Sequence, residues 1–118
     1  MSQHMLQVNF TFSVSVPEYE AIMEPLTGSF ATIPGCRWKI WLMNEKLYQA
    51  GGLYLFESHH TAEQFCVSAL MESLMAHPAL SNFSIKGYGI LEKHSLLTRA
   101  PLLIGSTAAR QGPYVRGK

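Results

Sequence analysis

A lysine lies between two tryptophans in the segment Trp38-Lys39-Ile40-Trp41, and Tyr54 follows the glycine pair Gly51-Gly52 further along the chain. Ammonium, phenol O–H and indole N–H groups all donate hydrogen bonds. Set among apolar walls and beside a proton acceptor, such groups can bind an electron-rich phenol or hydroquinone and stabilise the oxyanion that its deprotonation leaves. Because an ionised phenol can itself give an electron to dioxygen, these residue types allow an oxidation that needs no bound cofactor.

Four side chains are candidates for that chemistry: Tyr54, Lys39, Trp38 and His59. The first three would orient and polarise the substrate oxygen. His59 or its neighbour His60 would accept the proton, since the positive end of a helix dipole favours neutral imidazole. Five further residues are expected to bind the substrate: Trp41, Phe56, Phe65, Tyr88 and Arg99.

A structural role competes with each of these assignments. The two tryptophans, Tyr54 and Tyr88 also suit a core or a dimer seam, histidines are commonly solvated, and Arg99 would lie on an exposed arm. A buried lysine without a partner is costly. We therefore expect Lys39 either at the rim of a barrel or paired with a carboxylate such as Glu57.

The sequence lacks the residues that several other kinds of catalytic site require. The chain contains no aspartate, which excludes a Ser-His-Asp triad. Cys36 and Cys66 have no metal-binding or redox spacing and are expected to be inert. The sequence shows neither a metal cluster nor a glycine-rich phosphate loop, so we predict no metal and no cofactor. Asn9 and His77 invite comparison with haem-degrading relatives of similar fold, but the strand pattern points Asn9 away from the helices.

Composition limits the partners. The 118 residues make one domain, and a formal net charge of +1 argues against nucleic acid and against a membrane surface. The N-terminus lacks the build of a signal peptide and no apolar run could span a bilayer, so the cytoplasm is the expected compartment. With 47% apolar and 14% charged residues, we expect some apolar surface to be covered by more than the chain's own core.

The periodicity places these residues on a βαββαβ framework. Residues 6–13 alternate apolar and polar side chains, which predicts a strand with Leu6, Val8, Phe10 and Phe12 facing a core. Further strands are predicted at 37–43, 49–56 and 83–93. Helices are predicted from Pro17 to about residue 31, kinked or split by Pro25, and from an N-cap at Ser58 to Pro78. This order predicts a ferredoxin-like α+β domain over residues 1–94 and a C-terminal arm over 95–118.

One face of such a sheet lacks helices, because right-handed crossovers place both helices on the same side. Trp41 and Met43 are expected to project from that uncovered face. Burying them against a second sheet would contribute about 2 kcal/mol each. The sequence therefore predicts a homodimer that closes a dimeric α+β barrel.

Two segments carry a resemblance to a known family: Pro34-Gly35-Cys36-Arg37-Trp38-Lys39-Ile40-Trp41 and Ala50-Gly51-Gly52-Leu53-Tyr54-Leu55-Phe56. Together with Thr98-Arg99-Ala100-Pro101-Leu102, they resemble the YdhR-like mono-oxygenase family over most of residues 5–102. The resemblance implies a dimeric α+β barrel and kinship with cofactor-free mono-oxygenases that oxidise quinol-like or polyketide aromatic rings.

Three hypotheses remain open. The first is a cofactor-independent mono-oxygenase that uses molecular oxygen on a small aromatic molecule. The second is a non-catalytic protein that binds a small hydrophobic metabolite in the same pocket. The third is a structural dimer, which would lack a cavity larger than about 300 Å³.

Overall fold

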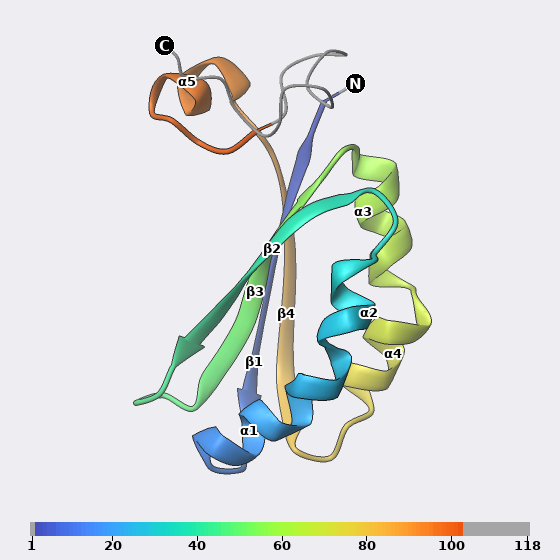
Figure 1. Cartoon of the computed structure of the whole chain (residues 1–118), viewed down its shortest axis with the longest axis vertical. Coiled ribbons are helices and arrows are strands. Elements are labelled where there is room, and N and C mark those ends of the chain that lie inside the picture. Colours follow the sequence, from blue (N-terminus) through green and yellow to red (C-terminus); the bar gives the residue numbers. More distant parts are fainter. Residues whose placement is uncertain (1, 103–118) are drawn as a thin grey trace.

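Four antiparallel strands form a single sheet in the order β2-β3-β1-β4, in a computed structural model that describes residues 2–102. The strands are β1 (His4–Phe12), β2 (Cys36–Asn44), β3 (Gln49–Phe56) and β4 (Leu80–Gly89). The ferredoxin-like α+β fold is therefore confirmed, and β3 has the predicted bounds (Figure 1).

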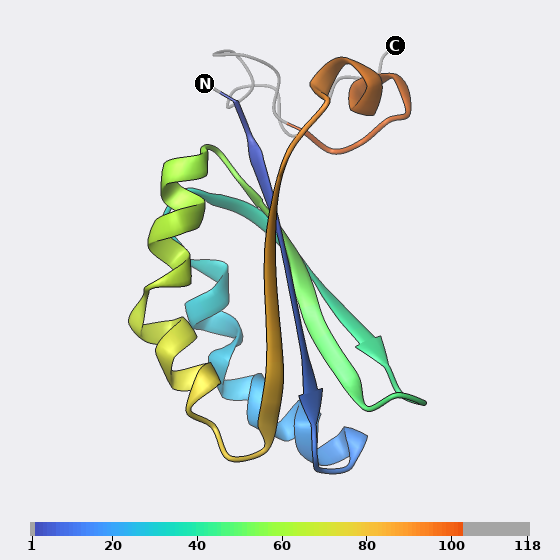
Figure 2. The same cartoon turned by 180° about the vertical axis from the view of Figure 1, so that it is seen from behind.

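The helices are α1 (Val16–Met23), η1 (Glu24–Leu26), α2 (Thr27–Ala31), α3 (His59–Cys66), α4 (Ala69–Met75) and α5 (Glu92–Leu97). Figures 1 and 2 show α2, α3 and α4 on one side of the sheet, whereas the opposite side carries none of them. We call that opposite side the open face. No helix within residues 2–102 is long and apolar enough to cross a membrane.

Local signals explain where these helices begin and break. Pro25 splits the first predicted helix as expected, because proline cannot donate the backbone hydrogen bond that continues an α-helix. Ser58 caps α3 by accepting the backbone N–H of Thr61, as predicted. The second predicted helix is nevertheless two helices, since Ser68 accepts the N–H of Met71 and starts α4.

The end of the domain differs from the prediction. β4 stops at Gly89 rather than near residue 93, and α5 follows across the predicted boundary at residue 94. The backbone N–H of Gln3 donates to the Glu92 carboxylate at 3.2 Å, which connects α5 to the start of β1. The division into a domain and an arm stays a prediction, and residues 103–118 of that arm lie outside the described residues.

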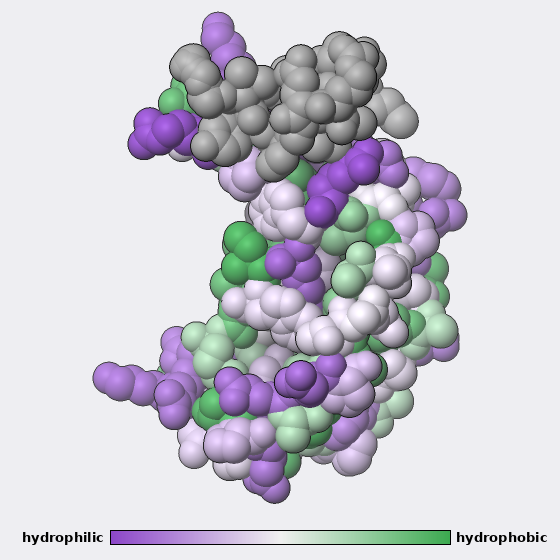
Figure 3. All heavy atoms as spheres, in the orientation of Figure 1, coloured by the Kyte–Doolittle hydropathy of each residue, from purple (hydrophilic) through white to green (hydrophobic). Residues whose placement is uncertain are grey.

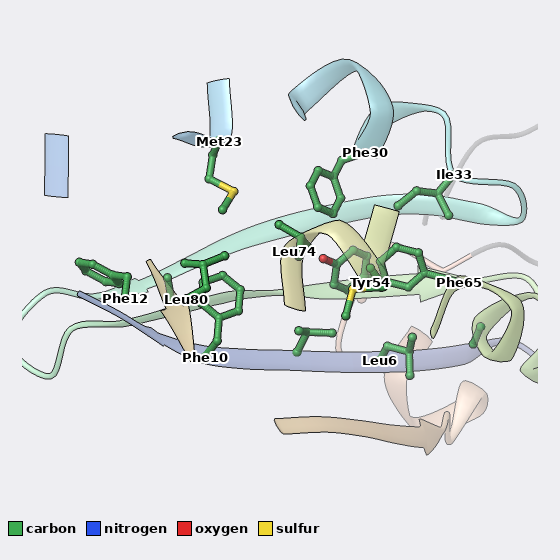
Figure 4. Close-up of a cluster of buried hydrophobic side chains, with 14 of the residues drawn as sticks. Leu6, Phe10, Phe12, Met23, Phe30, Ile33, Tyr54, Phe65, Leu74 and Leu80 are labelled. Atoms are coloured by element: carbon green, nitrogen blue, oxygen red, sulfur yellow. The ribbon is translucent and has the colours of Figure 1, made fainter. Parts of the chain in front are cut away.

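The core fills the space between the sheet and its helices. Leu6, Val8, Phe10 and Phe12 are all buried there, which confirms the alternation predicted for the first strand. They pack with residues from the helices and from β3, including Phe30, Tyr54 and Phe65 (Figure 4). This aromatic core supports the floor of the candidate site.

The prediction that Trp41 and Met43 project from the open face is wrong. In the register of β2 with β3, Trp41 lies beside Gly52 and Met43 beside Ala50, on the side covered by helices. Because β2 is an edge strand with large side chains on both faces, alternation alone could not assign its sides. The helices reach this edge only in part, so Trp41 and Met43 stay 40% and 42% exposed.

The open face is nevertheless apolar, but the apolar residues on it are not Trp41 and Met43. The register places on it Met5, Ile40, Leu42, Leu53, Leu55 and Tyr88. Ile40 and Tyr88 are each 48% exposed, and Leu55 is buried. Figure 3 shows hydrophobic atoms gathered along the hollowed left flank of the molecule, the side of the sheet that faces away from the helices.

Candidate functional site

Two neighbouring cavities lie between the edge strand β2 and the helical segments α1, η1 and α2. The first, which we call the lysine cavity, has a volume of about 250 Å³ and is lined by residues that include Thr27, Phe30, Cys36, Lys39 and Trp41. The second, which we call the Met groove, has a volume of about 470 Å³ and is lined by residues that include Tyr19, Met23, Thr27, Trp41 and Met43. Trp41 and Thr27 border both, so together the two cavities can hold an elongated ligand.

Lys39 lies inside a box of aromatic rings. Its Nζ is 3.3 Å from the centroid of Phe30, 3.4 Å from that of Trp41 and 4.9 Å from that of Tyr54. Within residues 2–102 no carboxylate forms an ion pair with it. The predicted partner Glu57 pairs with Arg37 at 3.2 Å instead, so a Lys39–Glu57 pair is wrong.

The surroundings of Lys39 bring the pKa of its amine close to neutral pH. Burial lowers the pKa of Lys39 from its ordinary 10.5 to about 7, while Cys36, the smaller influence, raises it. The ring faces favour the ammonium form and also work against the shift. Burial raises the pKa of the Cys36 thiol to about 11, which keeps that neighbour protonated and uncharged. Lys39 is thus the amine that can serve as a base in this pocket.

The pH dependence of the free energy of unfolding should reveal the lowered pKa of the Lys39 amine. In the unfolded chain Lys39 has its ordinary pKa of 10.5, so between pH 7 and 10.5 the unfolded state binds more protons and folding becomes more favourable as the pH rises. Below that window the full cost of burying the charge is present. We expect Lys39→Met to raise the free energy of unfolding by about 1–3 kcal/mol at pH 6, and by less at pH 9.5.

Urea denaturation of both proteins at the two pH values measures this difference. A stability difference of the same size at both pH values would contradict a lowered pKa at Lys39. Lys46→Met, which changes a solvent-exposed lysine in the turn after β2, is the matched control.

Tyr54 lies in the layer beneath the two cavities and carries a hydroxyl group. Its side chain is 2% exposed, and its ring lies 4.9 Å from that of Phe65 and 6.3 Å from that of Phe30. Among the residues that the structure describes, none makes a hydrogen bond to its hydroxyl. Burial raises the pKa of Tyr54, so the hydroxyl keeps its proton. A buried hydroxyl without a partner is costly, and a ligand oxygen would satisfy it.

Gly52 makes room for Lys39 above the sheet. A Cβ atom at this position would lie 2.7 Å from Cε of Lys39 and 3.3 Å from Cε1 of Tyr54. A Cβ at the neighbouring Gly51 would collide with the carbonyl oxygen of Val8 on the adjacent strand. Glycine at both positions thus permits close approaches, by the backbone of β1 at Gly51 and by the Lys39 side chain at Gly52.

The structure brings together five of the predicted site residues. Lys39, Trp41 and Tyr54 share one side of the sheet, and the rings of Phe56 and Phe65 lie next to that of Tyr54 (Figure 4 labels Tyr54 and Phe65). Only Lys39 and Trp41 among them line the cavities directly. The others form the layer beneath.

Trp38 also lines the lysine cavity, although its indole nitrogen donates to the carbonyl oxygen of Pro101 at 2.9 Å and its register partner is Leu55 of the open face. The other three predicted residues lie elsewhere. Tyr88 is also on the open face, and Arg99 is exposed after α5.

His59 is solvent-exposed and lines neither cavity. Its ring lies 4.8 Å from that of His4, and its Nε2 is 3.5 Å from the Glu63 carboxylate. Within the described residues, the group placed to accept a proton beside the lysine cavity is therefore Lys39 rather than His59.

Sequence reasoning missed Phe30 and Thr27 as parts of the site. Phe30 is the buried residue of α2. Its contact with Lys39 depends on how α2 packs over β2 after the intervening turn. Neither the helix pattern nor the strand pattern of the sequence predicts this packing. The break at Pro25 was the one signal that this helix changes direction above the sheet.

The residues that invited comparison with haem enzymes do not converge. Asn9 pairs with Gly51 and Ser84 on the open face, whereas His77 follows α4 and accepts the N–H of Ala79 at its Nδ1, at 3.1 Å. Within the described part of the chain, no group of three His, Cys or Glu side chains is arranged to hold a metal ion. These residues therefore do not form a haem-binding site together.

Comparison with known families places the chain in one of them. A family model described as "Putative mono-oxygenase ydhR" matches residues 5–101, which include every residue of both cavities. No sequence among curated proteins matches this chain.

Solved structures with the same fold include proteins of several kinds. A mutant of SnoaB, a cofactor-independent oxygenase from Streptomyces nogalater, has a TM-score of 0.62 at 15% identity, covering 77% of this chain and 95% of its own. The protein SO0527 from Shewanella oneidensis has a TM-score of 0.61 at 11% identity, with 75% and 91% covered. The heme-degrader MhuD from Mycobacterium tuberculosis has a TM-score of 0.57 at 13% identity, with 74% and 95% covered. At these identities the likeness extends to the fold alone.

Proposed function

The chain belongs to the family described as "Putative mono-oxygenase ydhR", and from this premise we propose that it is a cofactor-independent mono-oxygenase of a small phenol or hydroquinone. The observation that carries the proposal is the aromatic box. It holds a half-buried amine that has no carboxylate partner within residues 2–102, beside a buried tyrosine whose hydroxyl makes no hydrogen bond within those residues. An ionisable aromatic hydroxyl complements both groups.

The proposed reaction begins with a proton transfer. Neutral Lys39 takes the proton of the substrate hydroxyl, and the ammonium that forms lies over the faces of Phe30 and Trp41, which stabilise it. The hydroxyl of Tyr54 donates to the phenolate oxygen. The Lys39 ammonium and the Tyr54 hydroxyl would both bind the ionised substrate more strongly than the neutral one. Stronger binding of the reacting form than of the starting form is the requirement for catalysis.

Dioxygen then reacts with the bound phenolate. One electron passes from the phenolate to dioxygen, and the two radicals combine into a peroxide anion. This anion takes the proton back from the Lys39 ammonium to give a hydroperoxide, and the loss of water, which includes the ring hydrogen, leaves a carbonyl. One phenol and one dioxygen give one quinone and one water, so the substrate supplies all the electrons. Apolar walls that include Phe30, Trp41 and Met23 exclude water from the reactive intermediates.

We propose that a second copy of the chain covers the open face. The exposed and half-buried apolar residues of the open face all lie on the same side of the sheet. Packing two such faces together would build the barrel. Because the cavities lie on the other side of the sheet, each copy would keep its own site. The proposed partners are thus a second copy, a small aromatic molecule and dioxygen.

A binding function without catalysis has its own support. The Met groove is larger than the lysine cavity and is lined by apolar side chains such as Met23 and Met43. A hydrophobic metabolite could occupy this groove without contact to Lys39. In that situation Lys39→Met would leave ligand affinity unchanged, whereas an ionised substrate would lose affinity.

Oxygen consumption tests the proposed function directly. The purified protein, dialysed against a chelator, is expected to consume dioxygen in the presence of one or more hydroquinones or naphthols, one dioxygen for each substrate. No uptake above the spontaneous rate across a broad panel would count against a mono-oxygenase of phenols.

Tyr54→Phe is expected to lower kcat by about 10-fold to 100-fold, since one oxyanion donor is removed while the ring stays in the core. KM should change little, and the free energy of unfolding should not fall, because the lost hydroxyl has no hydrogen bond within residues 2–102. Oxygen uptake and urea denaturation measure the two effects. Unchanged turnover would remove Tyr54 from the mechanism.

A further inference from the structure

The aromatic box also has the features of a nucleophilic site. A lysine amine reacts with carbonyl carbon only in its uncharged form, and desolvation in an apolar pocket is one way proteins maintain that form. Nζ of Lys39 lies over the faces of Phe30 and Trp41, without a carboxylate partner among the described residues, at a cavity of about 250 Å³. The lowered pKa of Lys39, which follows from its burial, supports a large uncharged fraction at neutral pH.

We propose that Lys39 condenses with small aromatic aldehydes to form an imine in the lysine cavity. The activity is separate from the proposed oxygenation, because it requires neither dioxygen nor an oxidisable hydroxyl. Phe30 and Trp41 line the lysine cavity, and their apolar rings favour aromatic over short polar aldehydes.

The step balances without another reactant. The lone pair of Nζ attacks the carbonyl carbon, and the electrons of the C=O double bond move to the oxygen. A proton passes from nitrogen to that oxygen to give a carbinolamine, and water leaves as the C=N bond forms. One amine and one aldehyde give one imine and one water.

The charges around the amine decide its pH range. The titratable groups near it are Cys36 on β2 and Tyr54 on β3, both held protonated by burial. Across Trp41, the Met groove is bordered by Glu20 on α1 and Glu24 on η1. Lys46, Lys86 and Lys93 are solvent-exposed lysines outside the box, and they provide internal references for reactivity.

Reductive trapping tests the proposal. The full chain is incubated at pH 7 without dioxygen with benzaldehyde and cyanoborohydride, and the benzyl groups added are located by peptide mass spectrometry. Lys39 is expected to be labelled at least about 10-fold faster than any exposed lysine, because an ordinary exposed amine is protonated at this pH. The labelling rate at Lys39 should rise with pH to a plateau, with a midpoint near 7.

Two variants of Lys39 and a separate measurement of oxygen uptake make the result of the trapping experiment decisive. Lys39→Arg and Lys39→Met should both lose the fast label and keep the slow labelling of exposed lysines. Equal labelling of all lysines, or fast labelling confined to the N-terminal amine, would overturn the proposal. Since trapping is done without dioxygen and turnover is measured separately, a failed label with intact oxygen uptake would reject the imine alone.

Discussion

Lys39→Met is expected to lower kcat/KM for a phenol or hydroquinone by about 10²-fold to 10⁴-fold, the usual contribution of a general base. The variant keeps an apolar stem of similar length over Gly52, so the box should stay packed. What it loses is the proton acceptor and the cation that would balance the phenolate. Initial rates of oxygen uptake at several pH values measure the effect.

The matched variant Lys39→Arg separates those two losses. A guanidinium keeps the positive charge but does not give up its proton at neutral pH. If Lys39 is the base, Lys39→Arg should be nearly as slow as Lys39→Met at a pH where the phenol is neutral in solution. It should recover partly at a pH above the phenol's own pKa, where the substrate is already ionised. Activity within about twofold of wild type in Lys39→Met would contradict the proposed proton transfer.

Ile40→Glu is expected to convert the proposed dimer into a monomer. Ile40 is 48% exposed on the open face, so a carboxylate there is solvated in a single chain but would be buried without a partner between two sheets. Burying an unpaired charge costs several kcal/mol, which corresponds to a rise in dissociation constant of about 10²-fold or more. Sedimentation velocity over a range of protein concentrations measures it.

Val67→Glu serves as the control for added charge. Val67 lies at the end of α3, on the helical side, and is 78% exposed. This variant should sediment as wild type does, while Ile40→Glu sediments as a folded monomer. A wild-type protein that is already monomeric and well folded in dilute solution would reject the dimeric barrel.

The parts of the fold that follow local rules could be predicted from the sequence. The alternation of Leu6, Val8, Phe10 and Phe12 was sufficient to define the core side of β1, because one face of that strand is buried and the other is not. Pro25 and Ser58 identified a helix break and a helix start through backbone hydrogen bonding alone. The order of elements then restricted the topology to the ferredoxin-like fold.

The site could be predicted only in part. Lys39 and Tyr54 were identified by residue type, and the structure brings them together because they are register partners on β2 and β3. The sides of β2 could not be assigned, since tryptophans occupy both, and the packing of an edge strand against η1 and α2 decides the outcome. The pairing of Glu57 with Arg37, which leaves Lys39 to the rings, likewise depends on tertiary geometry.

The protonation of Lys39 is the property on which the proposed chemistry depends, and it can be measured by nuclear magnetic resonance. A pH titration of the lysine Cε signals, with the Lys39 signal assigned by its absence in Lys39→Arg, follows this one amine in the folded protein. We expect its midpoint at about 7. A midpoint at or above 10, as for an exposed lysine, would contradict the assignment of Lys39 as the base.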